Sequence, residues 1–251
     1  MASNAPATKS GLYADPREDW LALRKEEILD PTRPIVDPHH HLWDRGGQRY
    51  LIEELAADIG SGHKVIATVY VEARSMYRAA GPEALRPLGE VEFANGAAAM
   101  SASGGYGSAA ICAGIVGHAN LLLGEAARPV LEAEIAAGNG RFRGIRHSSA
   151  WDADAEVAGM YALRPKGLLL DPIFREGFAC LAPLGLSFDA WLFHPQIGEL
   201  ADLARGFPDT AIVLDHCGGP IGVGSTPIGA RRFLPSGKPP SRTSQNVQMW
   251  W

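Results

Sequence analysis

Short apolar segments rich in β-branched residues alternate with longer amphipathic segments along most of the chain. Six of the short segments have the length and composition of buried strands, and they cover residues 34–41, 64–73, 109–119, 142–149, 186–195 and 210–219. Apolar side chains recur at helical spacing over residues 121–138, 171–185 and 195–208. Buried strands that alternate with helices are typical of a parallel sheet, because helices make the crossover connections.

These elements predict an α/β fold whose six strands form part of a (β/α) barrel, with an open doubly wound sheet as the alternative. The length of 251 residues suits one such barrel, which typically takes about 250 residues. Residues 35–224 are the barrel portion, and residues 1–34 form an extension with a helix from about Pro16 to Leu29. The glycine-rich stretch 101–108 precedes a strand instead of following one, so we expect a flexible loop over the barrel mouth.

Composition narrows the classes of partner and compartment. The chain is 46% hydrophobic and 20% charged, with a net charge of −5 and no long basic run, which argues against nucleic acid and anionic membranes. Neither a signal peptide nor an apolar run near the roughly 20 residues of a membrane span is visible. Three widely separated cysteines suit a reducing compartment, so we expect a cytoplasmic protein with a small-molecule substrate, and self-association stays open.

Polar residues that can bind metal gather where the predicted strands end. These residues are His39, His41, Glu72, His147, His194 and His216. In a parallel barrel the carboxyl ends of all strands meet at one face, which is where such barrels place their catalytic groups. His39 and His41 are two positions apart on an extended backbone, so their imidazoles face the same way and His40 faces the other way.

Each of these residues also has a plain structural interpretation. A lone histidine at a strand end, such as His147, is as often a hydrogen-bonded packing residue as a ligand. Asp37 and Asp44 are better suited to orienting the neighbouring rings than to binding metal. Cys217 is a poor candidate nucleophile, because no oxyanion-binding loop accompanies it.

The pattern Asp37-x-His39-x-His41 on a first strand, with His194 on a fifth and His216 on a sixth, resembles the amidohydrolase superfamily. The segments "VEARSMYR", "RGIRHSSAWD", "FDAWLFHPQ" and "LDHCGGP" are more narrowly similar to its family 2 branch, which contains sugar-lactone hydrolases and 2-pyrone-4,6-dicarboxylate lactonase. The resemblance implies a distorted (β/α)₈ TIM barrel of the amidohydrolase type.

The resemblance also implies site roles. It assigns a divalent metal, with zinc as the expected ion, to His39, His41 and His194, with Glu72 as an additional ligand. Some lactonases of this branch nevertheless work without a metal. His194 and His216 are then the catalytic histidines. Arg74, Arg146 and His147 stand at strand ends where they suit substrate binding; for the two arginines, ion pairing at the rim is the alternative.

The chemistry implied is metal-assisted opening of a small lactone or a related C–O or C–N bond. A divalent ion polarises the carbonyl and lowers the pKa of bound water towards about 7, and a nearby carboxylate takes the proton. In the superfamily that carboxylate is an aspartate at the end of strand eight. A decarboxylase built on the same histidines is one alternative, and a catalytically inactive fragment is another.

The end of the chain departs from the family pattern. The 36 residues after Asp215 contain four basic residues and no acidic one, and four prolines follow from Pro227. We therefore expect an irregular tail over 225–251 in place of strands seven and eight, with open sheet edges and no strand-eight aspartate. A one-base slip of the reading frame between about Gly224 and Gly229 would explain the tail. The codons of Ser244–Trp251, read one base earlier, permit a helix end, a turn and the start of a strand. A genuinely divergent tail is the alternative.

Overall fold

One curved parallel sheet organises the protein. The computed structural model describes residues 17–45, 48–159, 164–222 and 249–250. Seven strands pair in the order β1-β4-β5-β6-β7-β8-β9, and every pair is parallel. They are β1 (Pro34–His40), β4 (Lys64–Val71), β5 (Ala110–Gly117), β6 (Phe142–Arg146), β7 (Ser187–Ala190), β8 (Ile212–Leu214) and β9 (Met249–Trp250). The first six are the predicted strands.

The sheet stays open within the described ranges, so the barrel is incomplete. β1 pairs only with β4 there, and β9 only with β8. The side chains of Val36 on β1 and Ile66 on β4 are 52% and 45% exposed, although both belong to residue types that a closed barrel buries. The parallel α/β architecture is confirmed, and it corresponds to part of a TIM barrel.

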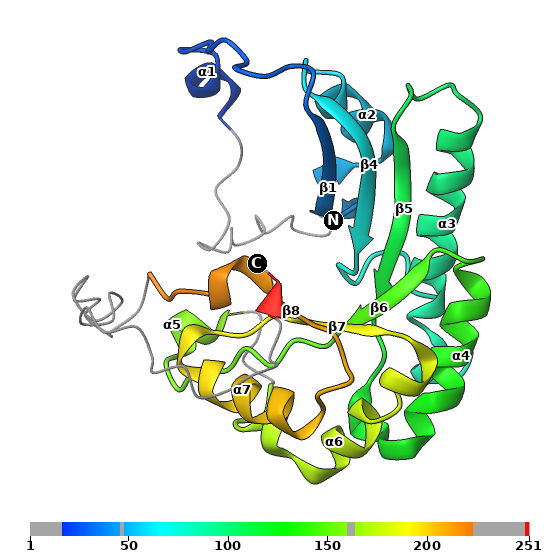
Figure 1. Ribbon diagram of the computed structural model, residues 1–251, viewed down its shortest axis with the longest axis vertical. Coiled ribbons are helices and arrows are strands. Elements are labelled where there is room, and N and C mark those ends of the chain that lie inside the picture. The colour runs from blue at the N-terminus through cyan, green and yellow to red at the C-terminus, as the bar shows by residue number, and fades with distance from the viewer. Residues whose placement is uncertain (1–16, 46–47, 160–163, 223–248, 251) are drawn as a thin grey trace, which may run out of the picture.

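The helices pack along the sheet and bury the main core against it (Figure 1). They are α2 (Ile52–Ile59), α3 (Leu88–Ala102), α4 (Ala127–Ala137), α6 (Pro172–Phe178) and α7 (Ile197–Gly206). The short α5 (Ala155–Ala158) instead contributes Val157 to a small separate cluster with Ala150, Phe193 and Ile221. Asp171 caps α6, because its side chain accepts hydrogen bonds from the backbone N–H groups of Ile173 and Phe174. Phe188 on β7 packs edge to face against Phe174 and Phe178 of α6, at centroid separations of 6.1 and 5.1 Å, and those two rings stack at 6.4 Å.

The predicted N-terminal helix is wrong over most of its length. Only α1 (Glu18–Leu21) is helical among the described residues of that segment. Its apolar side chains find no core: Leu23 is 78% exposed and Leu29 is 99% exposed. Amphipathic spacing stabilises a helix only when the apolar face is buried, and here that condition is not met.

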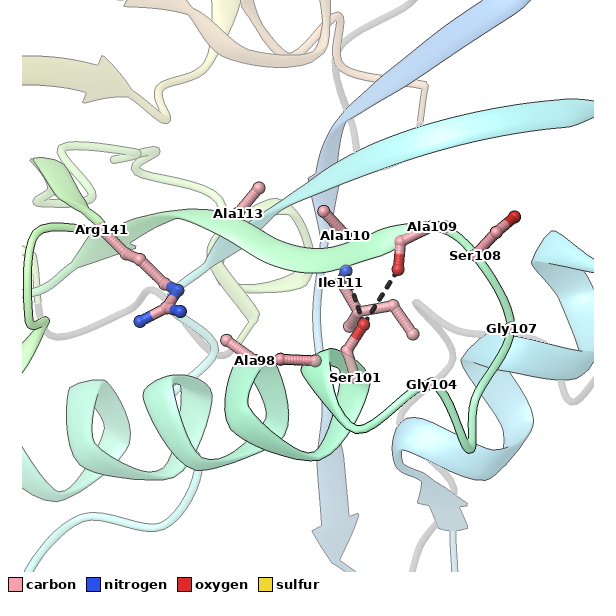
Figure 2. Close-up of a pocket in the computed structure, with 11 residues that line it drawn as sticks. Ala98, Ser101, Gly104, Gly107, Ser108, Ala109, Ala110, Ile111, Ala113 and Arg141 are labelled. Atoms are coloured by element: carbon pink, nitrogen blue, oxygen red, sulfur yellow. Dashed lines mark hydrogen bonds between the residues drawn. The ribbon is translucent and has the colours of Figure 1, made fainter.

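The glycine-rich loop lies at the opposite end of the strands from the one predicted. It leads into the amino end of β5, where Ser101 at the end of α3 donates to the carbonyl of Ala109 (2.9 Å) and accepts from the N–H of Ile111 (3.1 Å) (Figure 2). A cavity of about 480 Å³ opens there between α3 and β5, with Arg141 at its side. The loop therefore does not cover the carboxyl ends of the strands.

Two further elements were not predicted. β2 (Trp43–Arg45) and β3 (Gln48–Tyr50) form a small antiparallel hairpin after β1.

The tail predicted to be irregular lies outside the described residues except for β9, which pairs Met249 with Ile212 and Trp250 with Val213. Within the described ranges, every helix is too short or too polar to cross a bilayer.

Candidate functional site

β1 delivers two histidines to one side of the sheet. The rings of His39 and His41 lie 4.9 Å apart between centroids in an edge-to-face arrangement. His40 lies on the other side, where it is buried and its Nε2 is 2.8 Å from the hydroxyl of Thr68. His41 Nδ1 is 2.7 Å from the carbonyl of Val71, so Nδ1 carries the proton and Nε2 keeps a lone pair. A histidine held in this way is oriented for ligation through Nε2.

A tight turn after β8 brings an aspartate and a histidine to the same place. His216 and Cys217 both have positive φ, at 50° and 55°, which is unusual for residues with a side chain. Gly219 follows with φ of 52°, and a Cβ there would lie 2.2 Å from the carbonyl oxygen of Leu192. The close approach requires glycine, and the resulting turn leaves Asp215 buried and His216 exposed.

Three side chains from β1 and this turn form a candidate metal site. Potential ligand atoms of His39, Asp215 and His216 all lie within 4.8 Å of one another, which is the one such group of three among the described residues. The rings of His39 and His216 are 4.7 Å apart, and His39 Nδ1 is 3.9 Å from Asp215 Oδ1. Two imidazoles and a carboxylate are the donor set of zinc-class metals, so these residues fit a divalent ion.

Arg146, the last residue of β6, connects this group to Glu72. Its Nε donates to Glu72 Oε1 at 2.9 Å, and its Nη2 donates to the Glu72 backbone carbonyl. Its Nη1 lies 3.3 Å from His39 Nε2 and 3.4 Å from Asp215 Oδ2. Both Glu72 and Arg146 are buried, so one guanidinium balances two buried carboxylates.

Burial sets the protonation of the site. It lowers the pKa of His39 to about 3, with smaller contributions from the nearby charges of His41 and Arg146, and it lowers the pKa of His41 to about 4. Both rings are therefore neutral near pH 7, as ligation requires. Burial also raises the pKa of Asp215 against the opposing effect of Arg146. Asp189 on β7 has its pKa raised to about 7, first by burial and then by the charge of Asp215.

The predicted metal set of His39, His41, His194 and Glu72 is not gathered into one group of ligands. Glu72 is the ion-pair partner of Arg146. His194 begins a 3₁₀ turn (His194–Gln196), where its Nδ1 accepts from the N–H of Ile221 at 3.4 Å and its own N–H donates to Gly219. The ligand roles of His41, His194 and Glu72 stay predictions.

The predicted substrate-binding residues lie in different surroundings. His147 is buried, its ring lies 5.2 Å from His118 and 5.4 Å from Phe174, and its Nδ1 accepts from the N–H of Leu121. Burial lowers the pKa of His147 well below its ordinary value. These surroundings match the packing interpretation of His147. Arg74 is exposed just after β4, with φ of 57°.

Sequence reasoning missed four residues at the site. Asp215 shares a strand end with His216, so its adjacency to a candidate ligand was the available signal. Asp189 lies on β7, opposite Arg146 in the strand register. Trp191 follows it, with its ring 5.0 Å from that of His216. Trp43 likewise stacks beside His41 at 5.8 Å, so aromatic rings border both ends of the histidine group.

Comparisons with known proteins point to one protein family. The family model described as Amidohydrolase (Amidohydro_2) matches residues 36–236. The uncharacterized protein y4mH of Sinorhizobium fredii (strain NBRC 101917 / NGR234) is 30% identical over 206 residues, covering 73% of this chain and 62% of that protein. An amidohydrolase from Burkholderia multivorans, solved with bound zinc, is 24% identical with a TM-score of 0.50, covering 73% of this chain and 57% of its own.

A further solved structure, the amidohydrolase 2 from Bifidobacterium longum subsp. infantis, is 21% identical with a TM-score of 0.49, covering 77% of this chain and 66% of its own. The chain thus spans less than two thirds of the length of each of these three relatives. The family match nevertheless covers most of the chain, including β1 from Val36 onward and the turn after β8. On this basis the chain belongs to amidohydrolase family 2.

Proposed function

We propose that the protein is a metal-assisted hydrolase that opens a small lactone. Membership of amidohydrolase family 2 supports a metal-dependent hydrolase, and the zinc in the Burkholderia multivorans relative supports that metal. The observation that carries the proposal is the group of His39, Asp215 and His216 at the carboxyl ends of β1 and β8. When bound, a divalent ion polarises the substrate carbonyl and lowers the pKa of water.

The protein's own residues supply the remaining functions. Asp189 is the proposed proton acceptor, because a carboxylate whose pKa is about 7 is half ionised at neutral pH and suits general base catalysis. It stands beside Arg146 in the register of β6 and β7, near the charge of Asp215. It therefore fills the role that the family gives to an aspartate on strand eight.

The two tryptophans suit a ring-shaped substrate. Trp43 and Trp191 flank the histidine group from the hairpin after β1 and from the end of β7. Flat apolar rings bind the faces of a small cyclic ester, while polar groups between them contact its carbonyl. This arrangement supports a lactone as the substrate in preference to an open-chain ester.

The test is acid release from a panel of small lactones, followed in a pH-stat with and without added Zn²⁺. Asp215→Asn and His216→Asn should abolish turnover, whereas His63→Gln, at an exposed position outside the site, should not change it. Carbon dioxide release from carboxylated substrates would favour a decarboxylase. Metal binding with no turnover over the whole panel would favour an inactive metal-binding fragment.

A further inference from the structure

Arg146 and a metal ion require the same atoms. Arg146 Nη1 lies 3.3 Å from His39 Nε2 and 3.4 Å from Asp215 Oδ2. His39 and Asp215 are two of the three members of the candidate metal site. The guanidinium therefore lies against the site that a divalent ion would occupy.

The hydrogen bond to His39 determines where that ring carries its proton. A guanidinium has five N–H donors and no acceptor, so His39 Nε2 must be the acceptor. A neutral imidazole whose Nε2 accepts carries its proton on Nδ1, and Nδ1 faces Asp215 Oδ1 at 3.9 Å. Neither nitrogen then offers a lone pair to a metal. As long as Arg146 stays in place, His39 cannot be a ligand.

Arg146 can release these two residues without losing its main anchor. Its Nε and Nη2 are held by the carboxylate and backbone carbonyl of Glu72, and Nη1 alone contacts His39 and Asp215. Because Nε and Nη2 form one edge of the planar guanidinium, a tilt about that edge would move Nη1 away while the pair with Glu72 persists.

We propose that Arg146 is a built-in competitor of the metal: it occupies His39 and Asp215 in the metal-free protein, and metal binding requires its Nη1 to leave. The inference rests on the proposed metal site. It assigns Glu72 the role of holding the displaced arginine, in place of the ligand role predicted from sequence. It also explains how a buried carboxylate such as Asp215 is charge-compensated before metal arrives.

The test measures Zn²⁺ affinity of the EDTA-treated full chain by calorimetry. Arg146→Met should bind Zn²⁺ at least about tenfold more tightly than the wild type, because a unit positive charge and a competing donor are both removed. Arg146→Lys keeps the charge and should stay within about threefold of the wild type. Arg175→Met is the matched control, because Arg175 pairs with Asp202 on α7 and lies outside the site.

A second measurement needs no substitution. ¹⁵N NMR of histidine-labelled, metal-free wild type should show His39 protonated on Nδ1, and Zn²⁺ should remove that signal. Equal or weaker Zn²⁺ binding by Arg146→Met, or a metal-free His39 protonated on Nε2, overturns the competition while leaving the proposed hydrolase intact. If neither the wild type nor Arg146→Met binds Zn²⁺, the metal site and this inference both fail.

Discussion

The ion pair between Arg146 and Glu72 should contribute strongly to stability. Both side chains are 10% exposed, and Arg146 Nε lies 2.9 Å from Glu72 Oε1. Removing one member of a buried pair typically costs about 3–5 kcal/mol, because the other charge stays buried without compensation. For Glu72→Gln we expect the lower end, about 3 kcal/mol, because the amide oxygen still accepts, the backbone carbonyl still holds Nη2, and Asp215 still compensates the charge of Arg146.

Urea unfolding of the EDTA-treated protein measures this loss, since metal would otherwise add its own binding energy to the folded state. Glu53→Gln is the control: its pair with Arg49 has a similar separation of 2.8 Å, but the two side chains are 51% and 50% exposed. An exposed pair of this kind contributes less than about 1 kcal/mol. If Glu72→Gln costs no more than Glu53→Gln, the argument from burial is refuted.

Three other predictions concern the core and the buried acids. Phe188→Ala should lower the free energy of unfolding by about 3–5 kcal/mol in urea, because Phe188 is fully buried against two other phenylalanines. Burial, followed by the charge of Glu72, raises the pKa of Glu90 to about 7 from 4.5, so the folded protein binds more protons than the unfolded chain between those values. The stabilising contribution of Glu90 should therefore be lost as pH rises from about 4.5 to 7, so between these pH values urea titrations should show a more positive change in stability for Glu90→Gln than for the wild type. Asp189→Asn should reduce turnover by about 100-fold and remove from the pH–rate profile the rise in wild-type rate that ionisation of Asp189 produces at or below about pH 7.

The strands were predictable because their signals are local. A run such as Lys64–Val71 is short, apolar and β-branched, and each such run became a strand of the parallel sheet. The N-terminal helix failed for a physical reason: spacing shows that a helix could have an apolar face, but not that a partner exists to bury it. Leu29 is almost fully exposed, so that partner is missing from the described part of the protein.

The site was predictable only in part, for the same reason. The alternation of His39, His40 and His41 is a property of one strand, and the ring positions follow it. The contact of Arg146 with Glu72 joins residues 74 positions apart and depends on how neighbouring strands are aligned. One sequence does not reveal that alignment. The sequence therefore predicted Glu72 as a ligand but did not reveal that it pairs with Arg146.

The charges of the site explain why it can hold either Nη1 of Arg146 or a metal ion. Glu72 and Asp215 contribute two buried carboxylates, Arg146 contributes one cation, and His39 is neutral, so these groups carry one net negative charge. A divalent ion changes that balance to one net positive charge, which raises the acidity of nearby groups. The pKa of Asp189 would then be lower than in the metal-free protein, where burial raises it. Metal binding and the ionisation of the proposed base are therefore linked through charge, and carboxyl ¹³C NMR should show Asp189 losing its proton at lower pH in the Zn²⁺-loaded protein than in the EDTA-treated protein.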